Sequence, residues 1–136
     1  MADRVTVVGA GLGGSLMAAL LGREGRRVEL VERRLDPRQT QAEEGRSINL
    51  ALSERGLYAL AQVGLADRVL AHGVRLSGRM MHGLDGRLTF QPYGRGGQGI
   101  NSVSRTDLNR TLLDAAEGEA GVRVRFGLRC DEVDLD

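Results

Sequence analysis

A run of glycines near the amino terminus carries the strongest chemical signal in the sequence. It reads Gly9-Ala10-Gly11-Leu12-Gly13-Gly14, which matches the spacing G-x-G-x-x-G. In that spacing Gly9 permits a tight turn, Gly11 lets the backbone approach a pyrophosphate, and Gly14 lets a helix pack closely on a strand. The start of that helix adds backbone N–H groups and the positive end of a dipole. The motif therefore predicts a loop that binds phosphates.

An acidic residue follows the glycines at the distance expected for a ribose-binding carboxylate. Glu32 lies 18 residues beyond Gly14, close to the separation of about 20 that is typical of a ribose-binding acid. A carboxylate there accepts hydrogen bonds from ribose hydroxyls and repels a 2′-phosphate, which disfavours NADP at this site. Arg33 and Arg34 weaken that exclusion, because arginine accommodates the extra phosphate. The residues alone predict a bound dinucleotide and leave FAD and NAD both open.

These residues need a strand, a helix and a second strand to position them. The stretch 4–8 has the composition of a buried strand, and apolar residues recur at helical spacing over 12–24. Gly25 is a typical helix stop, and 28–31 is a second strand that ends at Glu32. A strand, helix and strand within about thirty residues form a βαβ unit with parallel strands. We therefore predict an α/β fold with a Rossmann-like core.

Patterns further along the chain predict an extension of this core and a hairpin outside it. Val122, Val124 and Phe126 alternate with arginines, as in a third core strand. Asp85-Gly86 lies between two extended runs, which is a strong hairpin signal. The other expected elements are a loop over 33–46, an extended stretch over 47–52, a helix over 54–63 capped by Ser53, a short helix over 67–71, hairpin strands over 78–82 and 87–91, a glycine-rich loop over 94–99, and a helix over 105–117 opened by Ser104 and Asp107.

Composition and charge exclude several classes of function. The 136 residues suffice for one core, and a net charge of +1 gives no basis for binding nucleic acid or an anionic membrane. No apolar run approaches the roughly 20 residues of a membrane helix. Cys130 is the only cysteine, which excludes an internal disulfide, fits a cytoplasmic location and predicts a packed or partly buried thiol. His72 and His82 lack further ligands at metal-binding spacing, so no metal site is expected.

Four segments beyond Glu32 have a more specific pattern than the glycines. They are GRSINLALSERG (45–56), GRMMHGLDG (78–86), QPYG (91–94) and SVSRTDLNRTLLDAA (102–116). The chain resembles the kynurenine 3-monooxygenases, a family of single-component FAD-dependent aromatic hydroxylases. The resemblance implies an FAD-binding flavoprotein of tryptophan catabolism. Such an enzyme uses NADPH and O₂ to hydroxylate L-kynurenine to 3-hydroxykynurenine.

The resemblance also implies roles for individual residues. Glu32 would bind the adenosine ribose of FAD, and Arg105 would contact FAD from the start of its helix. Arg79 and Tyr93 match positions that bind the amino-acid carboxylate of kynurenine, whereas their residue types alone predict a solvated strand residue and a loop residue. No side chain is assigned a catalytic role, because the flavin carries the oxygen chemistry. The other implied cofactor contacts are Gly9, Gly11, Gly13 and Gly14 at the pyrophosphate, Arg33, Arg34 and Leu52 on the FAD-binding surface, and Cys130 near the adenine.

The resemblance covers only the first part of a typical family member. We therefore expect residues 1–136 to form the amino-terminal part of an FAD/NAD(P)-binding domain, an incomplete domain whose hairpin, about 76–93, belongs to the substrate-side sheet. Family members carry a later Gly-Asp segment that this sequence lacks, so we expect the isolated chain not to hydroxylate kynurenine. Two alternatives stay open. One is a NAD-binding Rossmann domain of a dehydrogenase, and the other is a non-catalytic fragment that forms a homodimer or needs a carboxy-terminal partner chain.

Overall fold

A computed structural model describes residues 4–39, 48–96 and 99–134. Parts of three expected segments, the loop over 33–46, the extended stretch over 47–52 and the glycine-rich loop over 94–99, fall outside these residues. The chain divides into two compact units. The first joins Met1–Ser47 to Arg105–Asp136, and the second is the intervening Ile48–Ser104.

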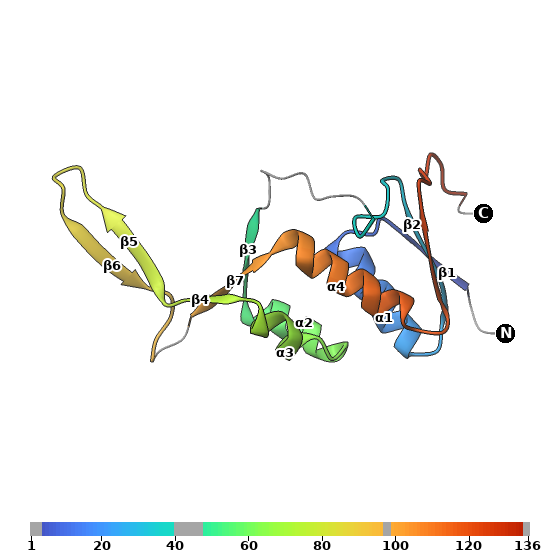
Figure 1. The fold of residues 1–136 in the computed structure, drawn as a ribbon, viewed down its shortest axis with the longest axis horizontal. Coiled ribbons are helices and arrows are strands. Elements are labelled where there is room, and N and C mark those ends of the chain that lie inside the picture. Colours follow the sequence, from blue (N-terminus) through green and yellow to red (C-terminus); the bar gives the residue numbers. More distant parts are fainter. Residues whose placement is uncertain (1–3, 40–47, 97–98, 135–136) are drawn as a thin grey trace. The chain divides into compact units, whose positions relative to one another are not determined.

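The first unit is built on a sheet of three parallel strands (Figure 1). These are β1 (Arg4–Val8), β2 (Arg27–Glu32) and β8 (Val122–Phe126), in the order β1-β2-β8. The central strand β2 pairs with both neighbours, and its Leu30 is fully buried. The parallel strands and the helix that connects the first two confirm the predicted α/β class and the third core strand.

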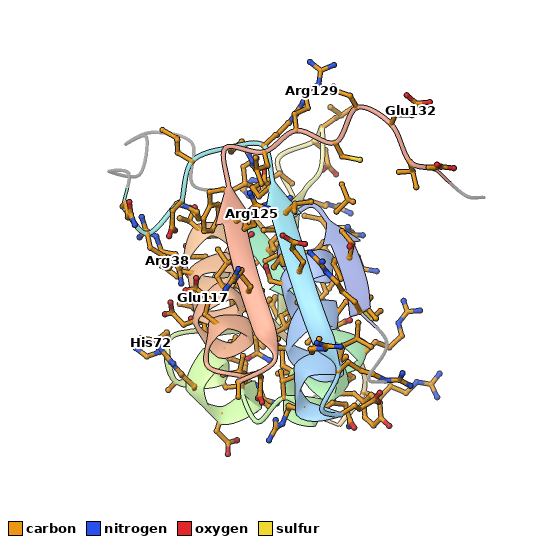
Figure 2. All side chains as sticks on the ribbon, turned by 90° about the vertical axis from the view of Figure 1, so that its right-hand side faces the viewer. Arg38, His72, Glu117, Arg125, Arg129 and Glu132 are labelled. Carbon is orange, nitrogen blue, oxygen red and sulfur yellow. The ribbon has the colours of Figure 1, made fainter. Side chains whose placement is uncertain are left out.

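Two helices pack side by side on one face of this sheet (Figures 1 and 2). α1 (Leu12–Arg23) ends before Gly25, which has a φ of +77° and confirms the predicted stop. α4 (Arg105–Glu117) spans the predicted residues. A Cβ at Gly22 would lie 2.5 Å from a methyl carbon of Val122, so the glycine lets α1 approach β8 closely. The buried apolar residues of this layer are Ala18, Ala19, Val28, Leu30, Leu108, Leu112, Leu113 and Ala116.

The second unit contains an antiparallel sheet that the sequence did not predict in full. Its strands are β3 (Asn49–Leu52), β7 (Ile100–Ser104) and β4 (Val74–Leu76), in the order β3-β7-β4. The short strands β4 and β7 were missed because β4 has three residues and β7 reads INSVS, without an alternating apolar pattern. The two helices of the unit are α2 (Glu54–Gln62) and α3 (Ala66–Ala71), close to the predicted bounds.

One detail of α2 differs from the sequence prediction. Ser53 occupies the N-cap position with extended backbone angles, but its side chain makes no capping hydrogen bond. The prediction of a Ser53 side-chain cap was therefore wrong, although the helix begins where it was expected. Glu54 in the first turn supplies a negative charge near the positive end of the helix dipole.

The predicted hairpin is present as a two-stranded ribbon (Figure 1). It pairs β5 (Gly78–His82) with β6 (Leu88–Pro92). The connection is wider than a two-residue Asp-Gly turn: Gly83 N–H donates to the Arg87 carbonyl at 2.8 Å, and Gly86 N–H donates to the Gly83 carbonyl at 3.0 Å. Gly86 has a φ of +81°, so a glycine is needed there although the turn is longer.

Candidate functional site

A cleft of about 550 Å³ opens in the first unit where β1 and β2 end. This volume lies within the range of about 300–1,000 Å³ that is typical of sites for small molecules and cofactors. The carboxyl ends of parallel strands are the usual ligand-binding edge of α/β sheets. Most of the residues that the sequence assigned to a cofactor are at this cleft. Its lining comprises Val8, Gly9, Gly11, Gly14, Val31, Glu32, Arg33, Arg34, Leu128, Arg129 and Cys130.

The glycines of the loop have different structural requirements. Gly9 has a φ of +98°, and its N–H donates to the Val31 carbonyl at 2.8 Å, which ties the loop to β2. A Cβ at Gly14 would lie 1.8 Å from the Gly9 carbonyl oxygen, so only glycine lets α1 begin this close to the turn. A Cβ at Gly11 or Gly13 would meet no atom within 4 Å. Gly11 lines the cleft, whereas Gly13 is exposed and is not part of the lining.

Ala10 connects the loop to three other elements through its backbone. Its N–H donates to Glu32 Oε2 at 2.9 Å. Its carbonyl accepts hydrogen bonds from Ser15 Oγ at 3.2 Å and from Asn109 Nδ2 at 3.1 Å. Ser15 is fully buried in α1, and Asn109 belongs to α4. Hydrogen bonds with residues of β2, α1 and α4 therefore fix the position of the loop.

Glu32 is a buried, ionised carboxylate at the edge of the cleft. Only 6% of it is exposed, and its Oε1 accepts hydrogen bonds from the Arg34 N–H at 2.9 Å and from Arg34 Nε at 3.0 Å. Burial raises the pKa of Glu32, but hydrogen bonds from the Arg34 side chain and from the Arg34 and Ala10 amides lower it by more, to about 2. The predicted ribose-binding residue is thus negatively charged at neutral pH.

The segment after β8 forms one wall of the cleft. Gly127 N–H donates to the Arg34 carbonyl at 3.1 Å, and Leu128 N–H donates to the Glu32 carbonyl at 3.0 Å. These bonds bring Cys130 to the cleft. Cys130 is exposed, so the prediction of a packed or partly buried thiol was wrong. The reason is that residues 128–134 form no helix or strand, which leaves the thiol at the surface.

The loop after Glu32 is fixed to α4 through Arg38. The Arg38 guanidinium contacts Asp36 Oδ2 at 2.7 Å, Asp114 Oδ1 at 3.0 Å and Glu117 Oε2 at 2.6 Å, and Figure 2 shows Arg38 beside Glu117. Hydrogen bonding to Asp36 is the largest cause that raises the pKa of Arg38, and the same contact lowers the pKa of Asp36. Arg110 Nε adds a bond to the Pro37 carbonyl at 3.0 Å.

The remaining predicted cofactor residues lie outside the lining of this cleft. Arg105 is an exposed residue at the first position of α4, in the first unit. Leu52 is buried, with 9% of its surface exposed, at the end of β3 in the second unit. Their proposed contacts with FAD stay predictions.

The two predicted substrate residues lie on the hairpin of the second unit. Arg79 is exposed and its Nε donates to Gln91 Oε1 at 2.8 Å across the ladder. Tyr93 is half-buried, and its N–H donates to the Ser77 carbonyl at 2.9 Å, which extends the ladder beyond β6. Arg79 is opposite Gln91 in the ladder, and Tyr93 directly follows β6 and lies opposite Ser77. The hairpin thus brings both residues to the same end of the ladder, and their shared role at the substrate stays a prediction.

Sequence reasoning missed Asn109 and Ser15, which hold the glycine loop. Ser15 directly follows the motif, and nothing in its spacing distinguishes it from a packing residue. Asn109 lies four residues after Arg105, and positions separated by four residues share a helix face. That spacing is the signal that relates Asn109 to the predicted FAD contact.

The residues that the structure describes contain neither a cluster of metal ligands nor a membrane-spanning helix. Among residues 4–39, 48–96 and 99–134, no group of three or more His, Cys, Asp or Glu side chains could hold a metal ion. His72 Nδ1 instead lies 3.0 Å from the Arg68 carbonyl oxygen, one turn earlier in the chain. Within the same residues, no helix has the length and apolar character needed to cross a membrane.

Comparison with known proteins agrees with the geometry of the cleft. A family described as FAD binding domain matches residues 3–136. The chain is 53% identical over 134 residues to a protein of Myxococcus xanthus named kynurenine 3-monooxygenase, covering 98% of this chain and 29% of that protein. It is 51% identical over 133 residues to a protein of the same name from Stenotrophomonas maltophilia, covering 97% of this chain and 29% of that protein. The chain thus spans less than a third of these relatives.

Solved structures share the fold. PqsL of Pseudomonas aeruginosa, in complex with 2-aminobenzoylacetate, superposes with a TM-score of 0.70 at 30% identity, over 98% of this chain and 36% of that one. The p-nitrophenol 4-monooxygenase PnpA of Pseudomonas putida gives a TM-score of 0.76 at 20% identity, over 97% of this chain and 33% of that one. The second likeness is one of fold alone.

Proposed function

Because the chain belongs to the FAD binding domain family, we propose that its cleft holds the ADP half of FAD. The family match over residues 3–136 favours FAD over the NAD alternative. The observation that supports the proposal most is the convergence of the glycine loop, Glu32 and the segment at Cys130 on one cleft. These residues come from both ends of the sequence, and their meeting at the strand ends suits a ligand that spans the sheet edge.

The shape and the donors of the cleft suit a diphosphate and a ribose. Open space at the Cβ position of Gly11 allows a phosphate to approach the backbone, and the start of α1 supplies N–H donors and a positive dipole end. Glu32 already accepts hydrogen bonds from Ala10 and Arg34. A carboxylate has about four acceptor sites, and all four are used, the weakest by Arg34 Nη2 at 3.5 Å. A ribose hydroxyl would therefore replace this long contact from Arg34.

We extend the proposal to the whole protein as a flavin monooxygenase that hydroxylates L-kynurenine with NADPH and O₂. The names of the two relatives at 53% and 51% identity support this substrate, and the role of NADPH rests on the family resemblance. When bound, the flavin would supply the oxygen chemistry. The residues of this chain would bind and orient: Glu32 the ribose, Gly11 the pyrophosphate, and Arg79 with Tyr93 the substrate carboxylate.

Several further assignments are part of the same proposal. Gly9, Gly13, Gly14, Arg33 and Arg34 are proposed at the FAD phosphates and ribose, with Arg105, Leu52 and Cys130 as additional FAD contacts. Residues 1–136 are proposed as the amino-terminal part of the FAD/NAD(P)-binding domain, with the hairpin at about 76–93 on the substrate side. The cytoplasmic location, the homodimer or partner chain, and the inactivity of the isolated chain stay predictions.

Direct titration tests the cofactor. Purified protein freed of flavin should bind FAD with saturable quenching of flavin fluorescence, and at least about tenfold more tightly than NAD. The reason is that the cleft offers phosphate donors and an ionised ribose acceptor in a chain of the FAD family. A colourless protein that binds NAD and ignores FAD would replace this proposal with the dehydrogenase alternative.

The substrate residues are tested on the hairpin. A charged hydrogen bond contributes about 1.5–3 kcal/mol and a neutral one about 1 kcal/mol. Arg79→Ala should therefore weaken kynurenine binding by roughly one to two orders of magnitude, and Tyr93→Phe by less. FAD content should be unchanged in both variants, and kynurenine affinity is compared at matched FAD occupancy.

Arg87 provides the matched control for this test. It lies on the same hairpin and pairs with Asp85 in an exposed ion pair at the turn. Arg87→Ala should leave kynurenine affinity as in the wild type. If Arg79→Ala binds kynurenine as the wild type does, Arg79 is a solvated strand residue and the carboxylate assignment is wrong.

A further inference from the structure

Two side chains donate hydrogen bonds to the carbonyl of the peptide unit between Ala10 and Gly11. The Ala10 carbonyl accepts the Asn109 amide at 3.1 Å and the Ser15 hydroxyl at 3.2 Å. Ala10 is buried, with 3% of its surface exposed, so this carbonyl points into the packed interior between the loop and the helices. Asn109 is half-buried, which protects its hydrogen bond from competition by water.

The other side of this peptide unit is the Gly11 N–H. A trans peptide is planar, so its N–H points opposite to its carbonyl. The Ala10 carbonyl faces Ser15 and Asn109, so the Gly11 N–H faces away from these side chains. Within residues 4–39, 48–96 and 99–134, no protein acceptor pairs with this N–H. Gly11 lines the cleft, where a Cβ would meet only open space.

We propose that Asn109 is a positioning residue for phosphate binding, because its amide fixes the Ala10 carbonyl and thereby aims the Gly11 N–H into the cleft. This inference rests on the proposed function, since it assumes that a phosphorylated ligand occupies the cleft. Glu32 holds the Ala10 N–H on the preceding peptide unit, so the loop is fixed at two successive peptides. Ser15 belongs to the helix that the loop opens, whereas Asn109 reaches the loop from α4, 99 residues away in sequence.

The test compares two ligands that differ only in phosphates. ADP would accept a hydrogen bond from the Gly11 N–H and adenosine would not. Loss of the Asn109 amide should therefore weaken the binding of ADP and leave the binding of adenosine unchanged. In Asn109→Ala, the affinity for ADP should fall by about tenfold, while the affinity for adenosine should change by less than about twofold. Both affinities are measured by calorimetry on the purified protein freed of flavin. Alanine favours the helix more than asparagine does, so the variant should fold.

Two further variants complete the experiment. Arg110→Met is the matched control, because it removes a bond of the same kind from the same helix, to the Pro37 carbonyl instead of Ala10. It should leave the ratio of ADP to adenosine affinity unchanged. Ser15→Ala removes the second donor to the Ala10 carbonyl and should lower that ratio in the same direction as Asn109→Ala.

The outcomes separate this inference from the proposed function. If the wild type binds neither FAD nor ADP, the proposed function fails. If the wild type prefers ADP to adenosine and Asn109→Ala keeps the same ratio, the positioning role is wrong while the cofactor assignment stands. If Asn109→Ala does not fold, the ratio in Ser15→Ala decides, and an unchanged ratio there overturns the inference.

Discussion

Three of the four glycines in the amino-terminal motif have different roles, and the structure gives no role to Gly13. Gly9 supplies a positive φ, and Gly14 makes room for its own helix against the Gly9 carbonyl. Both are required by the fold whether or not a ligand binds. Gly11 and Gly13 have open space around them, so the protein alone does not explain their lack of a side chain. Of these two, Gly11 lines the cleft and Gly13 does not, so Gly11 is the glycine whose lack of a Cβ is best explained by a ligand.

Valine substitutions at Gly11 and Gly13 distinguish a side chain that blocks the ligand from one that is merely added near it. Gly11→Val should weaken FAD binding by at least about 30-fold, because its side chain would occupy the space where a phosphate approaches. Gly13→Val adds the same side chain in the first turn of α1, outside the cleft lining. A smaller loss of FAD affinity than in Gly11→Val would remove Gly13 from the proposed phosphate contacts, and an equal loss would keep it there. Fluorescence titration with FAD gives both values. Unchanged FAD affinity in Gly11→Val would refute the glycine-loop assignment.

The sequence predicted the cleft residues well where the motif fixes a local spacing. The glycine loop and Glu32 lie on one βαβ unit, so their meeting at the strand ends follows from parallel strands. Asn109 could not be assigned to the loop in this way. Its contact with Ala10 depends on how α4 packs beside α1, which is set by tertiary contacts across 99 residues rather than by a local pattern.

At the scale of elements, the loop after β2 depends on one arginine for its position. Arg38 has 21% of its side chain exposed and contacts three carboxylates, two of which belong to α4. Its guanidinium also lies over the Phe126 ring, 5.8 Å from the ring centre. The loop follows Glu32, Arg33 and Arg34 at the cleft, so Arg38 anchors the segment that carries these residues.

Removal of Arg38 should destabilise the first unit. Arg38→Met keeps most of the side-chain volume but removes the cation that Asp36, Asp114 and Glu117 share, which we expect to cost about 2 kcal/mol of unfolding free energy. Arg87→Met is the control, since its ion pair with Asp85 is largely exposed and should contribute about 0–1 kcal/mol. Urea unfolding of both variants measures the difference. Equal stabilities would show that the contacts of Arg38 contribute no more than a surface ion pair.

Elements with a strong local pattern were predicted to within a few residues, and the others were not. β2 and β8 alternate apolar residues, and α4 keeps its apolar positions at helical spacing, so each was readable alone. β7 is a strand because it pairs with both β3 and β4, and only Val103 among its residues is buried. Pairing of this kind is a tertiary property, and the sequence pattern of β7 does not indicate it.

At the scale of the whole chain, the two units carry different parts of the proposed chemistry. The first unit is assembled from both ends of the sequence and holds the cleft with the glycine loop and Glu32. The second unit is the segment between them and carries the hairpin with Arg79 and Tyr93. Apart from Leu52 in the second unit, the proposed cofactor contacts all belong to the first unit, and the proposed substrate contacts belong to the second. Substitutions on the hairpin should therefore change the affinity for kynurenine and leave the affinity for FAD unchanged. The variants Arg79→Ala and Tyr93→Phe test this directly.

The stability of the first unit should depend on pH through carboxylates whose pKa is lowered in the fold. Burial raises the pKa of Glu32, but its hydrogen bonds lower it from 4.5 to about 2. The pKa of Asp36 is lowered mainly by Arg38, and that of Glu29 mainly by Arg125. A carboxylate whose pKa is lower in the folded state stabilises the protein above its unfolded pKa. That contribution is lost as the pH falls through the folded pKa.

For Glu32 the loss should occur between about pH 4.5 and pH 2. The urea midpoint of the wild type should be constant from about pH 7 to pH 5 and fall steeply below. Glu32→Gln cannot titrate, so it should be less stable at pH 7 and lose less stability on acidification. The remaining slope of this variant would come from groups such as Asp36 and Glu29. If the two proteins lose stability in parallel from pH 4.5 to pH 2, the hydrogen bonds from Ala10 and Arg34 do not hold Glu32 ionised, and its assignment as a charged ribose acceptor loses its physical basis.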